Sequence, residues 1–324
     1  MTTSPAVVFG LPAYNRPDTL PETLESILAQ TYRDFALVIV DDSASEETER
    51  VVSPYLVRDG RIRYERNARR LGMVGNWRRA FDLGRRLYPG GRYFAWVSDH
   101  DVWHPRWLEV LVDELERDPN VVLAYPVALR TFRNARPAIN RTFDTFGITD
   151  PGRRLRAASL RMMAGNLVYG LFRTEQLARA GVFRRVLVPD RQVLLALSLL
   201  GQFKQVPQLL WYREIQRGFS LHRQRSVLFA GRAPVYTYVP AHLTHAALLL
   251  WDFGVLGRGL PEIGRVRVVW YSLLQLLTSI ARELRTAWNV LEGWLGRSHR
   301  GRAVHRQPTS ATVAQPGDRE NTAA

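Results

Sequence analysis

The chain has 324 residues, an apolar fraction of 46% and a formal net charge of +15. It contains no cysteine, so disulfides, thiolate metal sites and cysteine nucleophiles are excluded. Lys204 is its only lysine, so 44 of the 45 basic residues are arginine. The net positive charge favours phosphate-bearing partners but does not distinguish among nucleic acid, nucleotide and anionic lipid.

Strands and helices are predicted to alternate through the first 125 residues. Apolar runs predict strands at 6–11, 35–40, 62–65, 93–97 and 121–125. Periodic or capped segments predict helices at 20–28, after Ser43, at 74–87 and at 105–117. This alternation predicts an α/β fold with a mostly parallel central sheet, covered by helices on both faces. The N-terminus shows no basic region followed by an apolar core, so we expect no signal peptide and a cytoplasmic location.

Carboxylates follow two of these predicted strands. Asp41 and Asp42 end the second strand, while Asp99 and Asp101 follow the strand at 93–97. Open α/β sheets bind ligands at the carboxyl ends of their strands, so these side chains are expected to converge on one crevice. A carboxylate pair separated by one residue can hold a divalent cation, which in turn holds a diphosphate. A turn residue and a helix cap are the ordinary alternatives for such a pair.

The second half of the chain is less regular. Residues 130–160 read as a long irregular connection, followed by a strand at 166–172 and a short helix at 174–180. Asp190 then precedes an apolar helix at 193–200, and a last strand is predicted at 203–211. Residues 233–251 carry no formal charge, but their prolines and histidines argue against a membrane-spanning helix.

A long amphipathic helix is predicted at 266–294, and a polar, disordered tail from residue 297. Three roles stay open for this helix: packing on the preceding domain, peripheral membrane attachment and self-association. Trp270, Trp288 and Trp294, with arginines nearby, suit an anionic lipid interface. The steady seven-residue spacing suits a homo-oligomer, although tryptophan fits poorly in a coiled-coil seam.

Several motifs occur in a fixed order over residues 6–213. They are Leu11-Pro12-Ala13-Tyr14-Asn15-Arg16, the helix 20–32, Val38-Ile39-Val40-Asp41-Asp42-Ser43, the spaced set Asn67, Gly72, Asn76 and Ala80, and Ser98-Asp99-His100-Asp101. In order and spacing the chain resembles the family 2 glycosyltransferases of GT-A fold. No Gln-x-x-Arg-Trp signature accompanies these motifs, so we expect a single addition rather than processive synthesis.

The resemblance implies binding roles for a nucleotide-sugar donor, a UDP-, GDP- or dTDP-sugar. The residues implied are Pro12, Ala13 and Tyr14 along the nucleotide, Asp42 at the base or ribose, Asp99 at the ribose, Asn76 in the same motif set, and Arg70 (or Arg69) at the base or phosphate. A solvated surface arginine is the alternative for Arg70. Asp101 would ligate Mg²⁺ or Mn²⁺ bridging the diphosphate.

The resemblance also implies the chemistry. Asp190 would act as the general base for a hydroxyl of a glycan or lipid-linked acceptor, which attacks the anomeric carbon with inversion. The family often has two acidic residues here, whereas this chain has Asp190 alone in 188–192, so a helix cap is its alternative role. We expect His100 to point away between the two carboxylates. We also expect His222, the histidine next after Arg213, to be a surface residue.

These observations predict a catalytic domain at 1–225, with a nucleotide-sugar half to about 130 and an acceptor half at about 131–225. A helical extension follows at 226–296 and is a candidate for membrane association. The remaining residues, 297–324, are predicted to be a tail. Two other functions remain as alternatives. A nucleotidyltransferase usually has a first loop rich in glycine and lysine, which 11–15 is not. A non-catalytic module binding nucleic acid or another anion would need a recognised motif, and none is evident, so no specific nucleic-acid partner is expected.

Overall fold

A computed structural model describes residues 4–132, 135–139, 143–215, 221–258 and 263–303. The chain divides into a compact unit, Met1–Ile280, and a second unit, Ala281–Ala324. The predicted boundary near residue 225 falls inside helix Leu221–Phe229 of the first unit. The functional division into a catalytic domain and a helical extension stays a prediction.

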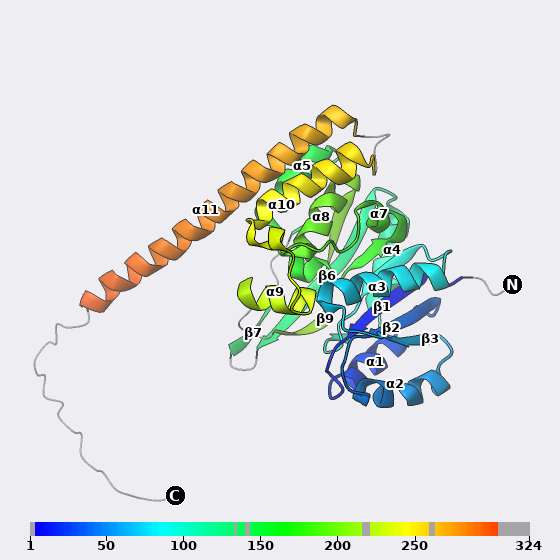
Figure 1. Ribbon diagram of the computed structural model, residues 1–324. Helices are drawn as coiled ribbons and strands as arrows, with labels where there is room; N and C mark the ends of the chain where they lie inside the picture. The colour runs from blue at the N-terminus through cyan, green and yellow to red at the C-terminus, as the bar shows by residue number, and fades with distance from the viewer. Residues whose placement is uncertain (1–3, 133–134, 140–142, 216–220, 259–262, 304–324) are drawn as a thin grey trace, which may run out of the picture. The chain divides into compact units, whose positions relative to one another are not determined.

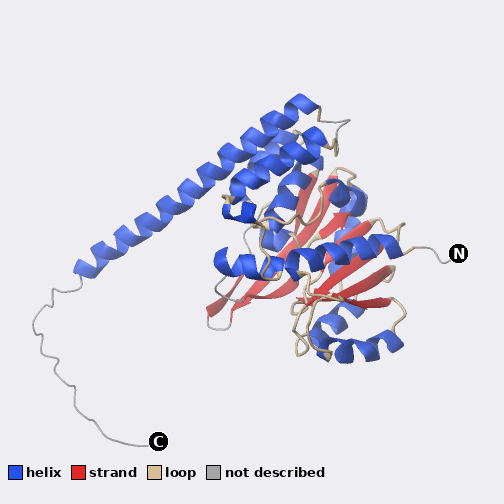
Figure 2. Cartoon of the chain, in the orientation of Figure 1, coloured by secondary structure: helices blue, strands red, loops and turns tan. Residues whose placement is uncertain are grey.

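One mixed sheet, drawn in red in Figure 2, organises the first unit. Its strand order is β3-β2-β1-β4-β8-β6-β9-β5, with β7 paired to β6. The strands are β1 (Val7–Ala13), β2 (Phe35–Asp41), β3 (Ile62–Arg66), β4 (Tyr93–Trp96), β5 (Val102–Trp103), β6 (Val121–Phe132), β7 (Ala135–Ile139), β8 (Leu171–Arg173) and β9 (Gln202–Ile215). The pairs among β1 to β4 are parallel, as is β6 with β9, whereas β5, β7 and β8 run antiparallel to their neighbours. The predicted α/β class with a mostly parallel sheet is confirmed.

Helices cover both faces of this sheet (Figures 1 and 2). They are α1 (Leu20–Leu28), α2 (Glu47–Arg58), α3 (Gly72–Leu87), α4 (Trp107–Arg117), α5 (Pro151–Arg161), α6 (Ala164–Leu167), α7 (Thr174–Arg179), α8 (Pro189–Leu200), α9 (Leu221–Phe229), α10 (Ala241–Leu249) and α11 (Arg265–Ala303), with short helical turns at Val235–Tyr238 and Leu250–Val255. In Figure 1, α1 and α2 lie on one side of β1 and β2, and α3 lies on the other. This arrangement follows from the chain moving outward from β1 to β3 and then returning through α3 to β4.

A cluster of aromatic rings forms the core beneath the ends of the central strands. Trp96 of β4 is fully buried and meets five other rings, with centroids 4.8 to 6.2 Å away: Trp77, Phe81, Phe94, Phe172 and Phe183. Its indole N–H donates to the carbonyl of Trp77 at 2.9 Å, so its polar atom is satisfied inside the core. These rings join α3 to β4 and β8 and give the site above them a rigid base.

Two buried arginines hold α5 and α8 together, each at the other helix's C-terminal end. Arg154 of α5 donates to the carbonyls of Ser198 and Leu199 at 2.8 and 3.0 Å, where α8 ends. Arg191 of α8 donates to the carbonyl of Ser159 and, at 3.5 Å, to that of Met162, where α5 ends. Cations at helix C-termini satisfy open carbonyls and complement the helix dipole. This pairing places the start of α8 relative to the sheet.

We expect Arg154→Met to lower the free energy of unfolding by about 3 kcal/mol. The change removes donors from four carbonyls, including those of Ile148 and Thr149, and buried unpaired acceptors are costly. Thermal denaturation measures it, with Arg156→Met, an exposed neighbour on the same helix, as the matched control. Equal melting temperatures for both variants would show that these contacts contribute nothing to stability.

The structure corrects three expectations from the sequence. Residues 130–160 are not one irregular connection, since β6 continues to Phe132, β7 pairs with it, and α5 occupies Pro151–Arg161. The strand predicted at 166–172 is mostly helix α6 and a turn, with only β8 extended. Helix α11 continues past residue 297 to Ala303, and the remainder of the predicted tail lies outside the described residues.

None of the helices in the described part of the chain is long and apolar enough to cross a membrane. In the first unit, the buried side of α11 is mixed, since Val268 and Tyr271 are buried on it together with four polar residues. Ser272, Gln275, Thr278 and Ser279 are buried, while Val266, Trp270, Leu273 and Leu277 are 48 to 86% exposed. A helix on a globular domain normally buries its apolar stripe, so this orientation leaves an apolar face without cover.

Candidate active site

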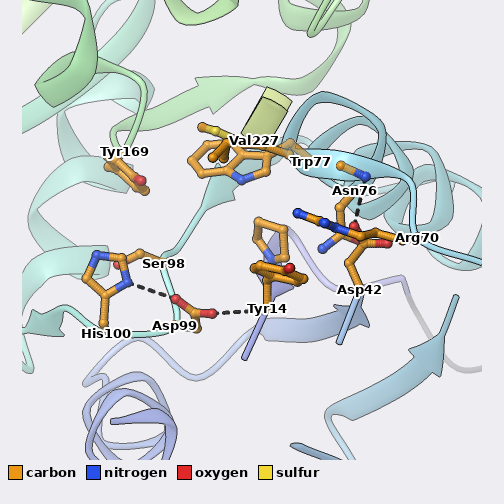
Figure 3. Close-up of a pocket in the computed structure, with 13 residues that line it drawn as sticks. Tyr14, Asp42, Arg70, Asn76, Trp77, Ser98, Asp99, His100, Tyr169 and Val227 are labelled. Atoms are coloured by element: carbon orange, nitrogen blue, oxygen red, sulfur yellow. Dashed lines mark hydrogen bonds and ion pairs between the residues drawn. The ribbon is translucent and has the colours of Figure 1, made fainter. Parts of the chain in front are cut away.

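Three strand ends and the start of α3 enclose a cavity of about 180 Å³ (Figure 3). Because β1 lies between β2 and β4, their following loops meet at one edge of the sheet. Six of the nine predicted site residues line this cavity: Pro12, Tyr14, Asp42, Arg70, Asn76 and Asp99. Ala13 and Asp101 lie next to lining residues in the chain, and Asp190 comes from α8.

Asp42 organises the loop that precedes α3. Its carboxylate accepts hydrogen bonds from the backbone N–H groups of Leu71 and Gly72 at 2.7 and 2.8 Å, and from the Asn67 amide at 2.8 Å. Two of these donors belong to the first turn of α3, where a negative charge is favourable. A carboxylate has about four acceptor positions, so one remains for a ligand.

Asn76 ties the ends of β1 and β2 to α3. Its amide nitrogen donates to the carbonyls of Ala13 and Val40 at 3.2 and 3.0 Å, and its oxygen accepts from Asn67. The side chain is 3% exposed, and both its N–H groups are used within the protein. Its geometry is that of a residue that positions the cavity wall, and direct contact with a ligand stays a prediction.

Tyr14 and Arg70 form the mouth of the cavity. The Arg70 guanidinium lies 4.7 Å from the centre of the Tyr14 ring, and both are labelled side by side in Figure 3. The backbone N–H of Tyr14 donates to Asp99 at 2.9 Å, which ties the first loop to the end of β4. Planar cations and rings stack on aromatic bases, so this pair suits a nucleobase.

His100 lies between the two carboxylates and lines the cavity, so the expectation that it points away is wrong. Its Nδ1 is 2.8 Å from Asp99 Oδ1, and its Nε2 is 4.0 Å from Asp101 Oδ1. Burial by itself would lower the pKa of His100, but the hydrogen bond to Asp99 and the charges of Asp101 and Asp99 outweigh it, so the pKa is raised. The imidazole therefore bridges the carboxylates that the sequence presents as a pair.

Asp101 is 1% exposed and lies beyond the end of β4. Its backbone carbonyl accepts from Thr23 Oγ1 at 2.8 Å, which fixes the loop against α1. The described residues contain no group of three or more acidic, histidine or cysteine side chains placed to hold a metal. A carboxylate oxygen with few further protein ligands fits Mg²⁺ or Mn²⁺, which keep open positions for phosphate oxygens and water. A cation site at Asp101 stays a prediction.

Asp190 is the second residue of α8 and does not occupy its N-cap, which is Val188 in a left-handed conformation with φ 51°. Its Oδ1 accepts from the backbone N–H of Arg191 at 2.9 Å. Burial raises the pKa of Asp190, against the opposing effects of that hydrogen bond and of the Arg191 and Arg213 charges. A carboxylate with a raised pKa at the edge of a site suits proton transfer.

Tyr169 is a residue of the site that the sequence did not single out. It lines the cavity, is 7% exposed, and packs edge-on against Trp77 with centroids 5.3 Å apart. Its pKa is raised by burial first, lowered by Arg213, and raised further by the charges of three carboxylates, Asp101, Asp99 and Asp190. Tyr169 therefore lines the same cavity as Asp99 and His100.

Arg213 lies beside Tyr169. Its guanidinium donates to the Gly165 carbonyl and the Asn166 side chain at 2.6 and 2.7 Å, and it lies 5.2 Å from the Tyr169 ring centre. Tyr169 belongs to the strand predicted at 166–172, and Arg213 follows the strand predicted at 203–211. Nothing in their spacing indicated that the two side chains are in contact. His222 has no described side chain, so its predicted surface position is not tested.

A model of glycosyl transferase family 2 matches residues 9–172, about half of the chain. The chain belongs to glycosyl transferase family 2. Protein CgeD of Bacillus subtilis is 33% identical over 120 residues, 36% of this chain and 27% of CgeD. The Escherichia coli UDP-Glc:alpha-D-GlcNAc-diphosphoundecaprenol beta-1,3-glucosyltransferase WfaP is 33% identical over 91 residues, 28% of this chain and 34% of WfaP. The matched segments therefore cover about a third of the length of these relatives.

Solved structures of similar fold match a larger share of this chain than the sequence relatives do. Residues 1–349 of TarS from S. aureus match with a TM-score of 0.55 at 15% identity, covering 83% of this chain and 70% of that one. The mannosyltransferase PcManGT from Pyrobaculum calidifontis, in complex with GDP-Man and Mn²⁺, matches with a TM-score of 0.50 at 18% identity, covering 87% and 88%. At these identities the similarity establishes the fold, which is GT-A as predicted.

Proposed function

We propose that this chain transfers a sugar from a nucleoside-diphosphate donor to a hydroxyl group, with inversion at the anomeric carbon. The observation that carries the proposal is the strand-end cavity, which Asp42, Asp99, His100 and Tyr169 line together with Tyr14 and Arg70. Carboxylates repel a diphosphate when no cation is present and bind it through a divalent cation. PcManGT, of the same fold, is named in complex with GDP-Man and Mn²⁺.

The donor would lie across the strand ends. Its base would stack at Tyr14 and Arg70, and its ribose would approach Asp99 and the remaining acceptor position of Asp42. Asp101 would hold Mg²⁺ or Mn²⁺, and this cation supplies positive charge to the diphosphate as it leaves. Trp77 and Tyr169, both largely buried, would exclude water from the sugar.

Asp190 would accept the proton of the acceptor hydroxyl. As that O–H bond breaks, the oxygen forms a bond to the anomeric carbon, and the bond from this carbon to the diphosphate oxygen breaks. The electron pair leaves with the nucleoside diphosphate, and the proton stays on Asp190. Attack from the face opposite the leaving group inverts the configuration. Arg213, near Tyr169, would hold the acceptor side in place.

Product stereochemistry tests this proposal. We expect an α-linked donor to give a β-linked product, read from the anomeric proton coupling in the NMR spectrum of the isolated glycoside. Omission of divalent cation is expected to abolish release of the nucleoside diphosphate. An α-linked product would overturn the single-displacement role of Asp190, and nucleotide release that is unaffected by chelation would overturn the metal role of Asp101.

We also propose that the acceptor is lipid-linked. We propose further that α11 binds the surface of the membrane that carries this acceptor. WfaP is named for an acceptor of diphosphoundecaprenol type. In this chain, Trp270 and Leu277 are each 61% exposed on the outward face of α11, and Arg265 and Arg267 are exposed beside them. Tryptophan, leucine and arginine on one amphipathic surface favour an anionic lipid interface.

Vesicle flotation is expected to show binding to vesicles with about 30% anionic lipid and little binding to neutral vesicles, because both apolar burial and charge contribute. Trp270→Ser with Leu277→Ser should reduce the bound fraction at least about tenfold, since each buried apolar side chain contributes about 1.5–3 kcal/mol. Leu56→Ser with Val57→Ser, on the exposed side of α2, is the matched control. A dimer that dissociates on the α11 substitutions, without any vesicle binding, would contradict the membrane role in favour of self-association.

A further inference from the structure

A second cavity, of about 390 Å³, adjoins the nucleotide cavity on the far side of Arg70. Arginines from three separate segments line it: Arg69 and Arg70 before α3, Arg185 before α8, and Arg232 after α9. Among the described residues, no acidic side chain lines it. Four arginines from distant parts of the sequence thus line one cavity.

These arginines differ from their neighbours in their ion pairs. The four arginines of α3 each pair with an acidic side chain at 2.7 to 3.5 Å: Arg78, Arg79, Arg85 and Arg86. Arg184 is paired with Asp252, next to Arg185 in the chain. Within the described ranges, no ion pair reaches any of the four arginines of the cavity. Four arginines for which no ion pair is described therefore line one cavity.

The walls of the cavity are held firmly. The Tyr236 hydroxyl donates to the Arg185 carbonyl at 2.8 Å, and Arg78 donates to the carbonyls of Gly181 and Phe183, so the loop before α8 is anchored on both sides. On the opposite wall Gly72 has φ +76°, and a Cβ there would lie 2.6 Å from the backbone nitrogen of Ala230. This close approach fixes the chain after α9 against the loop that carries Arg69 and Arg70.

We propose that this cavity binds a phosphate or diphosphate group of the acceptor. The inference rests on the proposed function and specifies its acceptor class as phosphate-bearing. Guanidinium groups bind phosphate through paired N–H donors, and a cavity without acidic side chains does not repel it. The donor's own diphosphate has a separate place, because Asp99 and His100 lie on the other side of Tyr14 from Arg70 in Figure 3. The charges at Arg185 and Arg232 are thus left for a second anion.

The binding test uses inorganic pyrophosphate with a chelator present, so that a cation at Asp101 cannot bind it. We expect calorimetric titration to show binding that weakens as salt is raised. Arg185→Gln with Arg232→Gln should weaken it about 10- to 100-fold, because two charge-assisted contacts are lost. Arg50→Gln with Arg161→Gln is the control, since both are exposed and line none of the cavities described above. Equal affinities in the two double variants would overturn the site.

Acceptor kinetics identify the source of the phosphate. With a phosphate-bearing acceptor, the Arg185/Arg232 variant is expected to raise the acceptor KM at least about tenfold and to leave the donor KM unchanged. With the same glycan lacking phosphate, variant and wild type should have the same acceptor KM. If the variant loses pyrophosphate binding but treats both acceptors as wild type does, the site binds free phosphate and the acceptor assignment is wrong. Normal transfer in that case leaves the proposed function standing.

Discussion

Asp190→Asn is expected to lower the rate of sugar transfer by about 10²- to 10⁴-fold, with donor affinity unchanged. Asparagine keeps the shape and can still accept the hydrogen bond from the Arg191 N–H, but it cannot take a proton from the acceptor. Single-turnover measurements with saturating donor give the rate, and calorimetry gives donor affinity. Asp82→Asn, an exposed carboxylate on α3, is the control. A rate within tenfold of wild type would show that Asp190 is not the base.

The raised pKa of Asp190 also sets the direction of two pH effects. A general base must be ionised, so activity should fall as pH decreases through this raised pKa, at a higher pH than for an ordinary aspartate. For stability, a carboxyl group with a raised pKa in the folded state favours folding below its unfolded pKa and loses that contribution as pH rises through the folded pKa. At neutral pH its ionised form therefore opposes folding. Asp190→Asn should melt no lower than wild type there.

Asp101→Ala is expected to reduce transfer by about 10²- to 10³-fold and to remove the effect of Mn²⁺ on donor affinity. Asp101 is 1% exposed and Asp99 is 7% exposed, and both Asp99 oxygens receive hydrogen bonds from Tyr14 and His100. Donor titration with and without Mn²⁺ distinguishes a metal role of Asp101 from one of Asp99, since Asp99→Asn should keep the effect of Mn²⁺ on donor affinity. Asp113→Ala, exposed on α4, controls for charge. If Mn²⁺ still changes donor affinity in Asp101→Ala, the cation is not held by Asp101.

The first half of the fold was predictable because its signals are local. Continuous apolar runs such as Phe35–Val40 predict strands buried on both faces, and carboxylates after two of them indicate where a crevice lies. The periodic face of α1 (Leu20, Leu24, Ile27 and Leu28) is buried as expected. The chain beyond residue 130 was harder to predict, because β7 depends on pairing with β6, and α6 is only four residues long.

Within the site, residue types were easier to predict than orientations. The adjacency of His100 to Asp99 and Asp101 suggested a side chain directed away, as in a strand, but the segment turns and the imidazole lies between the carboxylates. Asn76 and Asp42 were expected at a ligand, and most of their hydrogen-bonding capacity is used on the loop and strand ends. The position of Tyr169 and the partly polar buried side of α11 depend on contacts between segments far apart in the sequence, which periodicity does not encode.

The central claim is that the strand-end cavity holds a nucleoside diphosphate through a cation at Asp101. Thermal denaturation of the whole chain with UDP, GDP and dTDP, each with and without Mn²⁺, tests it most directly. A ligand stabilises the folded state by an amount that grows with the logarithm of its concentration divided by Kd. We therefore predict a raised melting temperature with one nucleotide, only when Mn²⁺ is present, and no shift for Asp101→Ala. An unchanged melting temperature with every nucleotide, or an Asp101→Ala variant that responds as wild type does, would contradict this claim.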